Sequence, residues 1–359
     1  MLFKKYLVIV PGIILAFILY ALSQGLNNII GIELLGYNKS PISTAMIAIL
    51  LGIALGNILK IRKDFLIGLD FTQKYILKLG IICLGIQLKP FEFLKFGTVA
   101  IPLIVVCIIS VLIVIKLLIK KLKISTKMAY LISIGSTVCG TTAIMATAPI
   151  IKASKSEVAY AIANMTIFGI ISMLIYPYFA NIYFNGEPLF IGLFLGTAIH
   201  ETSQVAAAGL IYDQQFNSPE TLNIATVTKL IRNTFLVIMI PLFTFLYNRG
   251  KAKATSYSLL DIFPYFVLGF IGMIIFRNIG DQIFLTEGAL QFWQNSISNI
   301  KSSAKIFLSM AMAAVGLSTN LKDLKSMGYK PFIVGFIAMI TVGLVSIITM
   351  QLFDNYFFY

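Results

Sequence analysis

The chain has 359 residues, of which 58% are hydrophobic and only 12% charged, and its formal net charge is +14. A soluble domain is about 45–50% apolar and about 25% charged, so this composition excludes a soluble globular protein and indicates an integral membrane protein. The basic residues stand in short clusters between apolar runs, which is typical of the cytoplasmic loops of a membrane protein. Nucleic acid is therefore excluded as a partner.

Apolar segments of about the length that spans a bilayer, about 20 residues, follow one another along the chain. We expect eleven of them, at about 6–22, 41–59, 75–88, 98–119, 128–151, 157–180, 188–211, 221–247, 262–279, 297–318 and 331–353. The third is short, and the amphipathic residues 62–75 at its start are typical of a segment lying along the membrane interface. The predicted fold is an all-α polytopic membrane protein, with residues 1–359 as a single integral membrane domain.

The distribution of basic residues predicts the orientation. With the N-terminus in the cytoplasm, the inner loops carry 18 of the 28 Lys and Arg residues and the outer loops carry 5. Since cytoplasmic loops carry the excess of positive charge, we expect a cytoplasmic N-terminus, an external C-terminus and an odd number of spans. The three cysteines, Cys83, Cys107 and Cys139, lie in apolar runs and are odd in number, so a disulfide framework is not expected.

Two pairs of segments within the chain are similar to each other. GSTVCGTTAIMATA from Gly135 aligns without gaps with GTAIHETSQVAAAG from Gly196, at an offset of 61 residues. GIQLKPFEFLKFG from Gly85 and GLSTNLKDLKSMG from Gly316 form a second pair, which runs in opposite directions on the expected topology. The two offsets do not fit one simple duplication. Paired spans interrupted by Gly and small polar residues indicate a transporter's binding site, and the alternative is that these residues only let helices pack closely.

The first pair places small polar groups near the middle of two spans. The residues expected to bind a substrate there are Cys139, Gly140, Thr141, Thr142, Thr202, Ser203 and Gln204. A helix interrupted at such a point exposes backbone N–H groups at the start of its second half, and these donors favour an anion. His200, the only histidine, and Glu201 lie in the same run, and we expect them to sense or carry protons. Sodium coupling through carbonyl, Thr, Asn or Glu oxygens is an open alternative.

The following span carries two cations, Lys229 and Arg232, three residues apart on one helix face, with Asn233 beside them. A cation at the centre of a membrane helix costs about 2.5–3.5 kcal/mol on insertion scales, and only Glu201 is available there as a countercharge. One positive charge is then left over, and an anionic substrate would balance it. The alternative is that one cation pairs with Glu201 while the other extends to the interface or binds backbone carbonyls.

Enzyme chemistry has little support in the same segment. HETSQ at His200 resembles the zinc motif H-E-x-x-H, but Gln204 stands where the second histidine would be. Catalytic zinc would need Cys139, His200 and a carboxylate from separate spans, and a Cys139–His200 nucleophile pair has no identifiable orienting acid. We therefore expect no enzyme activity, no metal and no cofactor. A passive anion channel or a structural membrane protein is kept as the alternative to a carrier.

A family resemblance rests on several of these stretches. GSTVCGTTAIMATAPIIKA, IFGIISMLIYP and GTAIHETSQVAAAG resemble signature stretches of the YeiH family of bacterial inner-membrane proteins, to which sulfate export is ascribed. LGIQLKPFEFL and MAMAAVGLSTNLKDL look like two further family blocks, and the resemblance covers about residues 40–335. The family is similar to the bile acid, arsenite and riboflavin transporter superfamily, which implies broken helices that cross near the membrane midplane. One departure is Ala148 before Pro149, where relatives carry a glutamate.

The resemblance implies a division of the chain and a function. Residues 139–142 and 200–204 would be the crossing or site segments, within core-like segments at about 75–182, 188–247 and 297–330, and the other spans would form a panel. The predicted protein is an ion-coupled secondary transporter of a small anion such as sulfate, sulfite or a sulfonate, working by alternating access in the bacterial inner membrane. The expected partners are this anion, H⁺ or Na⁺ and the lipid bilayer, and a homodimer is left open.

Overall fold

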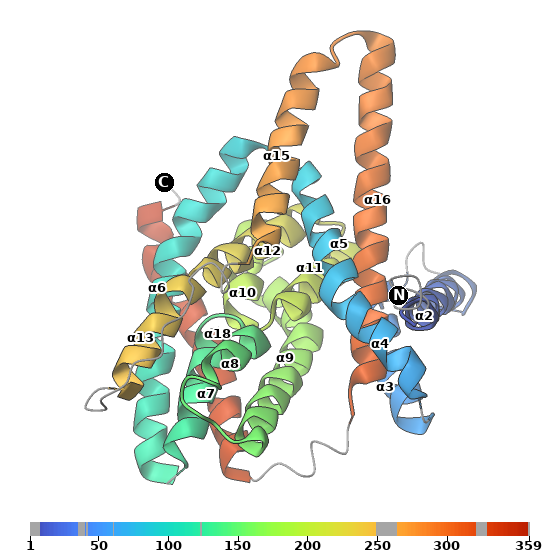
Figure 1. Ribbon diagram of the computed structural model, residues 1–359. Helices are drawn as coiled ribbons and strands as arrows, with labels where there is room; N and C mark the ends of the chain where they lie inside the picture. The colour runs from blue at the N-terminus through green and yellow to red at the C-terminus, as the bar shows by residue number, and fades with distance from the viewer. Residues whose placement is uncertain are drawn as a thin grey trace. The chain divides into compact units, whose positions relative to one another are not determined.

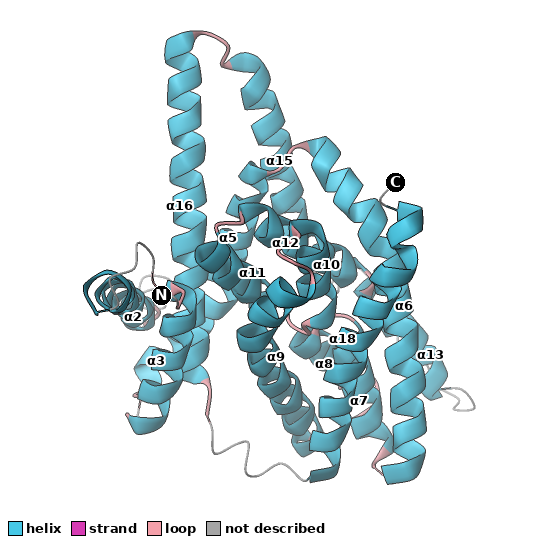
Figure 2. Cartoon of the chain, turned by 180° about the vertical axis from the view of Figure 1, so that it is seen from behind, coloured by secondary structure: helices cyan, strands magenta, loops and turns pink. Residues whose placement is uncertain are grey.

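The computed structural model describes residues 8–34, 40, 42–59, 61–122, 124–248, 264–320 and 329–357. The described residues form helices joined by short connections, as Figures 1 and 2 show, so the predicted all-α class is confirmed for them. The helices are α2 (Val10–Asn28), α3 (Thr44–Ile58), α4 (Lys63–Phe71), α5 (Leu77–Leu84), α6 (Pro90–Leu122), α7 (Thr126–Thr137), α8 (Gly140–Thr147), α9 (Lys155–Tyr183), α10 (Pro188–Ala198), α11 (Thr202–Phe216), α12 (Pro219–Thr234), α13 (Leu236–Asn248), α15 (Phe266–Ile283), α16 (Glu287–Ser318) and α18 (Tyr329–Phe357).

Seven helical segments among the described residues are long and apolar enough to cross a membrane. They are α2, α9, α15 and α16, most of α6 and α18, and the run Pro219–Phe243 that joins α12 to α13. The chain is therefore a polytopic membrane protein. Helix α4 continues through π-helical turns (Thr72–Ile76) into α5 as one helical run, and the interfacial position of residues 62–75 stays a prediction.

The chain folds into two compact units, each made of three stretches of sequence. Unit 1 contains Met1–Phe93, Ala206–Asn223 and Tyr265–Leu321, and unit 2 contains Leu94–Val205, Ile224–Pro264 and Lys322–Tyr359. Helices α6, α11 and α12 each have residues in both units. All the residues predicted to form the site fall in unit 2.

Unit 1 is held together by close helix contacts. A Cβ on Gly52 of α3 would lie only 2.9 Å from the Cα of Gly316 in α16, so these two helix backbones touch. Small residues at such contacts let helices approach and gain dispersion energy in lipid. Helices α15 and α16 form a long antiparallel hairpin, and α16 runs opposite to α5 (Figure 1). Gly85 and Gly316, the starts of the second predicted repeat pair, both lie at the C-terminal end of a helix.

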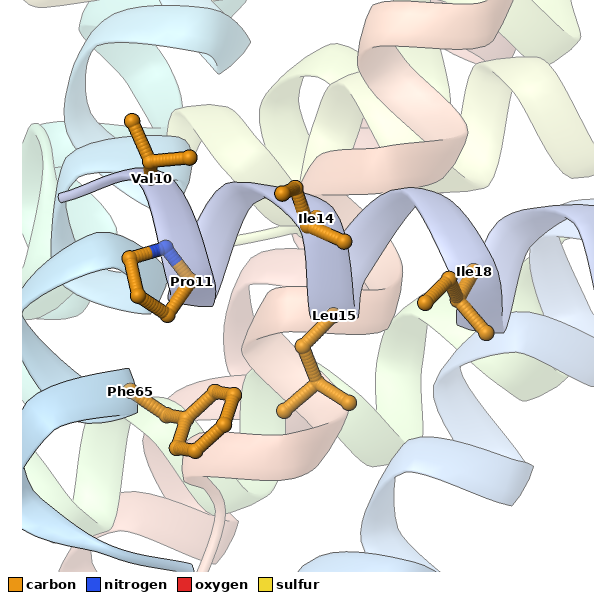
Figure 3. A pocket seen from close by; sticks show the side chains of 6 residues that line it. All are labelled: Val10, Pro11, Ile14, Leu15, Ile18 and Phe65. Atoms are coloured by element: carbon orange, nitrogen blue, oxygen red, sulfur yellow. The ribbon is translucent and has the colours of Figure 1, made fainter. Parts of the chain in front are cut away.

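Helix α2 presents an apolar face outside the core of unit 1. Val10, Ile14 and Ile18 are 44%, 51% and 49% exposed. Together with Phe65 of α4 they line a shallow apolar groove (Figure 3). In water such a face would be costly, but hydrocarbon tails are its natural surroundings. This face fits contact with lipid.

Unit 2 is built around α10, whose residues Ile191–Ala198 are all buried. Helix α18 packs against both α9 and α10, and the hydroxyl groups of Thr197 and Ser346 form a hydrogen bond of 2.7 Å between α10 and α18. The Thr197 hydroxyl donates to the carbonyl of Leu193 in its own helix at 2.7 Å and accepts from Ser346, so both buried hydroxyls have a polar partner. Helix α10 is therefore fixed in place, and its C-terminal end leads directly into the candidate site.

Candidate functional site

Two helical segments of unit 2 are interrupted at matching positions of the first repeat. Helix α7 ends at Thr137 and α8 begins at Gly140, while α10 ends at Ala198 and α11 begins at Thr202. The repeat offset of 61 residues pairs Cys139 with His200, so both interruptions occur at the same place in the repeated sequence. The backbone leaves the helical conformation at Cys139, with φ −137° and ψ 95°. Both interruptions that the sequence predicted are thus present.

The two interrupted segments contact each other at their breaks. The backbone N–H of Gly140 donates to the carbonyl of His200 at 3.3 Å. The N–H of Thr141 donates to Glu201 Oε1 at 3.1 Å, and the hydroxyl of Thr141 donates to the same oxygen. The predicted site residues of two separate stretches therefore form one cluster.

Lys229 of α12 is fully buried between the breaks. Its ammonium group donates to the carbonyls of Val138 and Ile199, each at 3.0 Å, and to the carbonyl of His200. An ammonium has three N–H donors, so all three have an acceptor from the backbone. These carbonyls come from the two breaks, one from the first and two from the second.

Arg232, one helical turn further along α12, is 1% exposed. Its Nε donates to the carbonyl of Thr137 at 2.9 Å, its Nη2 to the carbonyl of Ser136, and its Nη1 to that of Thr197. The last carbonyls of a helix lack partners within the helix and carry the negative end of its dipole. Arg232 and Lys229 therefore stabilise the C-terminal ends of both α7 and α10.

The two cations use backbone carbonyls rather than a carboxylate. No ion pair joins either of them to Glu201 in the part of the chain that the structure describes. The alternative expected from the sequence paired one cation with Glu201 and let the other bind backbone carbonyls or extend to the interface; the pairing is not seen among the described residues, and both cations bind carbonyls. The three donors of Lys229 have acceptors, and the formal charges of Lys229, Arg232 and Glu201 sum to one positive charge. Direct anion binding by Lys229 and Arg232 stays a prediction.

A second group of side chains gathers at the start of α11. Asn233 Nδ2 donates to the hydroxyl oxygen of Thr202 at 2.9 Å, and Cys139 Sγ lies 3.4 Å from the same oxygen. Cys139 Sγ also donates to Thr142 Oγ1 at 3.7 Å. Ser203 is partly exposed. The structure thus brings Cys139, Thr142 and Thr202 together as predicted partners of one site.

Gln204 and His200 do not join this hydrogen-bonded group. The amide of Gln204 donates to the carbonyl of Thr166 in α9 at 3.2 Å, and its side chain fills the space beside Gly169. His200 is fully buried, and neither ring nitrogen makes a hydrogen bond of ordinary geometry, although the ring lies near the backbone of Ala198. Its proposed role in proton coupling stays a prediction.

Sequence reasoning placed Asn233 only beside the cations and did not identify Thr166 or Gly169. The signal for Gly169 is a glycine in the middle of a long helix, where glycine costs about 1 kcal/mol relative to alanine and needs a packing reason.

No group of three His, Cys, Asp or Glu side chains able to hold a metal ion occurs among the described residues.

At Gly140 the two segments approach each other closely, and a substitution there is expected to disturb their contact. A Cβ at Gly140 would lie 2.8 Å from Cγ of Glu201 and 3.0 Å from its Oε1. Gly140→Ala is therefore expected to push the carboxylate off α8 and to lower stability by about 1–3 kcal/mol through overpacking. Thermal unfolding of the detergent-solubilised variant measures the effect. Gly272→Ala, where a Cβ has open space, is the control, and equal unfolding of the two variants would contradict the prediction.

The spans and the buried charged cluster define the class of protein as a multi-pass membrane protein. The chain belongs to the family described as Conserved hypothetical protein 698, whose model matches residues 11–335. It is 36% identical over 305 residues to a UPF0324 membrane protein of Fusobacterium nucleatum, covering 83% of this chain and 88% of that protein. It is 34% identical over 351 residues to a UPF0324 membrane protein of Streptococcus agalactiae, covering 98% of each. No solved structure matches the chain.

These relatives confirm the resemblance to the YeiH family over nearly the whole chain. Because the relatives are named as bacterial membrane proteins, the protein is a bacterial membrane protein with several spans. The cytoplasmic N-terminus stays a prediction from the distribution of basic residues.

Proposed function

We propose that the protein is a secondary transporter of small anions that works by alternating access. In this proposal the chain crosses the membrane eleven times, and the breaks at residues 138–139 and 199–201 lie near the midplane. The proposal is supported by the hydrogen bonds that Lys229 and Arg232 donate to backbone carbonyls at the C-terminal ends of α7 and α10. The N-terminal ends of α8 and α11 are then left beside a net positive charge.

A purely structural role explains this arrangement less well. Carbonyls at a helix end can be satisfied by neutral hydroxyl or amide donors, which cost far less to bury than two cations. Two buried cations with one nearby carboxylate leave a charge that a low-dielectric interior tolerates only when it is balanced. A substrate that carries the missing negative charge provides this balance, and half-helix N-termini are a recurring way in which transporters hold anions.

The direct test is counterflow in proteoliposomes that contain the purified protein. Vesicles loaded with an unlabelled anion are diluted into labelled sulfate, sulfite, methanesulfonate or succinate. A carrier is expected to accumulate label transiently above its equilibrium level, since exchange across an alternating site couples the two flows. A channel gives simple equilibration, and a structural protein gives no flux above that of empty vesicles. Either of these two results would contradict the proposal.

Glu201 supplies the proposed link to protons. Its carboxylate is partly exposed and accepts two hydrogen bonds from Thr141, so its protonation would change both the charge of the cluster and the contact between the breaks. Glu201→Gln is expected to abolish the response of anion uptake to an imposed pH gradient and to retain anion exchange. Uptake assays at equal and opposed pH gradients measure both quantities. A variant with the same gradient response as the parent protein would refute the role of Glu201 in proton coupling, and a parent protein that responds to a Na⁺ gradient and not to a pH gradient would favour sodium coupling.

A further inference from the structure

The N-terminal ends of the two half-helices differ in what occupies them. At α8, the N–H of Gly140 bonds to the His200 carbonyl, and the N–H and hydroxyl of Thr141 both donate to the Glu201 carboxylate. A carboxylate is the usual partner of a helix N-terminus, because it accepts from unpaired N–H groups and meets the positive end of the dipole. The protein therefore fills the anion position of α8 with a side chain of its own.

The corresponding end of α11 has no such partner. The N–H groups of Thr202, Ser203 and Gln204 are the first of this helix and so have no acceptor within it, and no acceptor is found for them among the described residues. The repeat explains the difference. The residue that corresponds to Glu201 in the first repeat is Gly140, which has no side chain to offer to α11.

The buried side chain of Asn233 also lies at the N-terminal end of α11. Asn233 is 2% exposed, its Nδ2 contacts the hydroxyl of Thr202 in the first turn of α11, and its Oδ1 has no partner in the described part of the chain. An unpaired amide oxygen at this depth costs about 1–3 kcal/mol. Rotation of the amide by 180° lets the Thr202 hydroxyl donate to Oδ1 and frees the NH₂ group to donate to a ligand.

The charges near this end set the kind of anion that it accepts. Lys229 and Arg232 contribute two positive charges and Glu201 one negative charge, with His200 counted as neutral. A monovalent oxyanion balances the remaining charge. A divalent anion such as sulfate leaves an excess negative charge unless Glu201 loses its own.

We propose that the transported anion binds at the N-terminal end of α11, between Ser203 and Asn233, and that Glu201 acts as a built-in competing anion at α8 that restricts the site to monovalent oxyanions. The inference rests on the proposed transport function and adds the position and charge of the substrate to it. The ligand oxygens accept hydrogen bonds from backbone N–H groups and neutral side chains. The buried cations Lys229 and Arg232 attract the anion electrostatically without contacting it.

Thermal stabilisation of the full-length protein in detergent tests the position of the site. Unfolding is followed over a concentration series of sodium methanesulfonate or sodium sulfate, against sodium chloride at equal ionic strength. Ser203→Ala is expected to weaken binding of methanesulfonate at least tenfold, and alanine is well tolerated in a helix. Ser156→Ala is the matched control, because Ser156 is likewise the second residue of its helix, α9, and it is expected to bind within twofold of the parent.

The same titrations test the role of Glu201. Glu201→Gln removes one negative charge, so the ratio of sulfate affinity to methanesulfonate affinity is expected to rise at least tenfold. An unchanged ratio would overturn the assignment of Glu201 as a competing anion. Equal affinities of the parent and Ser203→Ala, or a larger loss in Thr142→Ala, would overturn the position at α11.

Counterflow separates this inference from the proposed function. Anion flux in the parent protein combined with no effect of Ser203→Ala would leave the transport proposal standing and overturn the site. The expected binding pattern without counterflow would support the site and overturn transport. The absence of stabilisation by either anion, together with the absence of flux, would overturn both.

Discussion

Arg232→Met is expected to leave little folded protein. The guanidinium is the only donor found for the carbonyls of Ser136, Thr137 and Thr197 among the described residues. Methionine fills much of the same volume but donates nothing, so three buried carbonyls lose their partner at about 1–3 kcal/mol each. That sum is comparable to the whole folding free energy of a typical protein, about 5–15 kcal/mol. We expect the midpoint of thermal unfolding to fall by at least about 10 °C, as measured by size-exclusion of heated, detergent-solubilised samples.

Arg277→Met is the control for this result. Arg277 also lies in a helix and donates to Asp281 at 2.8 Å, but its side chain is 22% exposed and serves a single ion pair. An ion pair with access to solvent contributes about 1 kcal/mol or less. Arg232→Lys keeps the positive charge but loses the planar guanidinium that reaches several carbonyls at once. We therefore expect an intermediate fall in the midpoint of thermal unfolding. A similar fall for Arg232→Met and Arg277→Met would show that the carbonyl contacts do not stabilise the breaks.

Lys229→Met is expected to abolish anion-dependent stabilisation. A unit charge about 6 Å from a bound anion, at an effective dielectric constant of about 20, contributes about 3 kcal/mol, which corresponds to about a hundredfold in affinity. The loss of Lys229 also removes one of the two positive charges in the cluster, and with Glu201 ionised it leaves no net charge for an anion to balance. The anion series described above measures the effect as a lost shift in unfolding temperature.

Two comparisons separate this electrostatic loss from simple misfolding. Unfolding of Lys229→Met without any added anion gives its own stability, which is also expected to fall because three carbonyls lose a donor. Lys74→Met removes an exposed lysine that pairs with Asp70 at 2.8 Å, and the anion response is expected to be unchanged. If the Lys229→Met variant folds and the same anions still raise its unfolding temperature as they do in the parent, the proposed role of the Lys229 charge is wrong.

Most of the helical architecture could be predicted from local sequence. Helix α9 begins where Ser154 and Glu157 form a capping box, and α10 begins with Pro188 in its first turn, and both are signals that act within a few residues. The breaks after Thr137 and Ala198 were also predictable, because glycine and small polar residues in an apolar run disfavour a continuous helix. Such features depend on neighbours along the chain, and a sequence displays these directly.

The hydrogen-bond partners of the site residues could not be predicted in the same way. Lys229 and Arg232 bind backbone carbonyls. Because every residue has a backbone carbonyl, the sequence does not indicate which carbonyls will be the acceptors. Gln204 was grouped with Thr202 and Ser203 because they are adjacent in sequence. In the folded helix its side chain instead contacts Thr166 of α9, because residues two apart on a helix point in different directions.

The amino-acid sequence alone determined that this chain is a polytopic helical membrane protein with two matched interruptions and an excess of buried positive charge. Those properties follow from composition and spacing, which decide what the bilayer accepts. Only the tertiary structure decided that the cations hold the C-terminal ends of α7 and α10. It also decided that Glu201 occupies the start of α8, while the start of α11 has no hydrogen-bond acceptor from the described residues. Such contacts join residues that lie 29 to 96 positions apart, and only packing in three dimensions brings them within hydrogen-bonding distance.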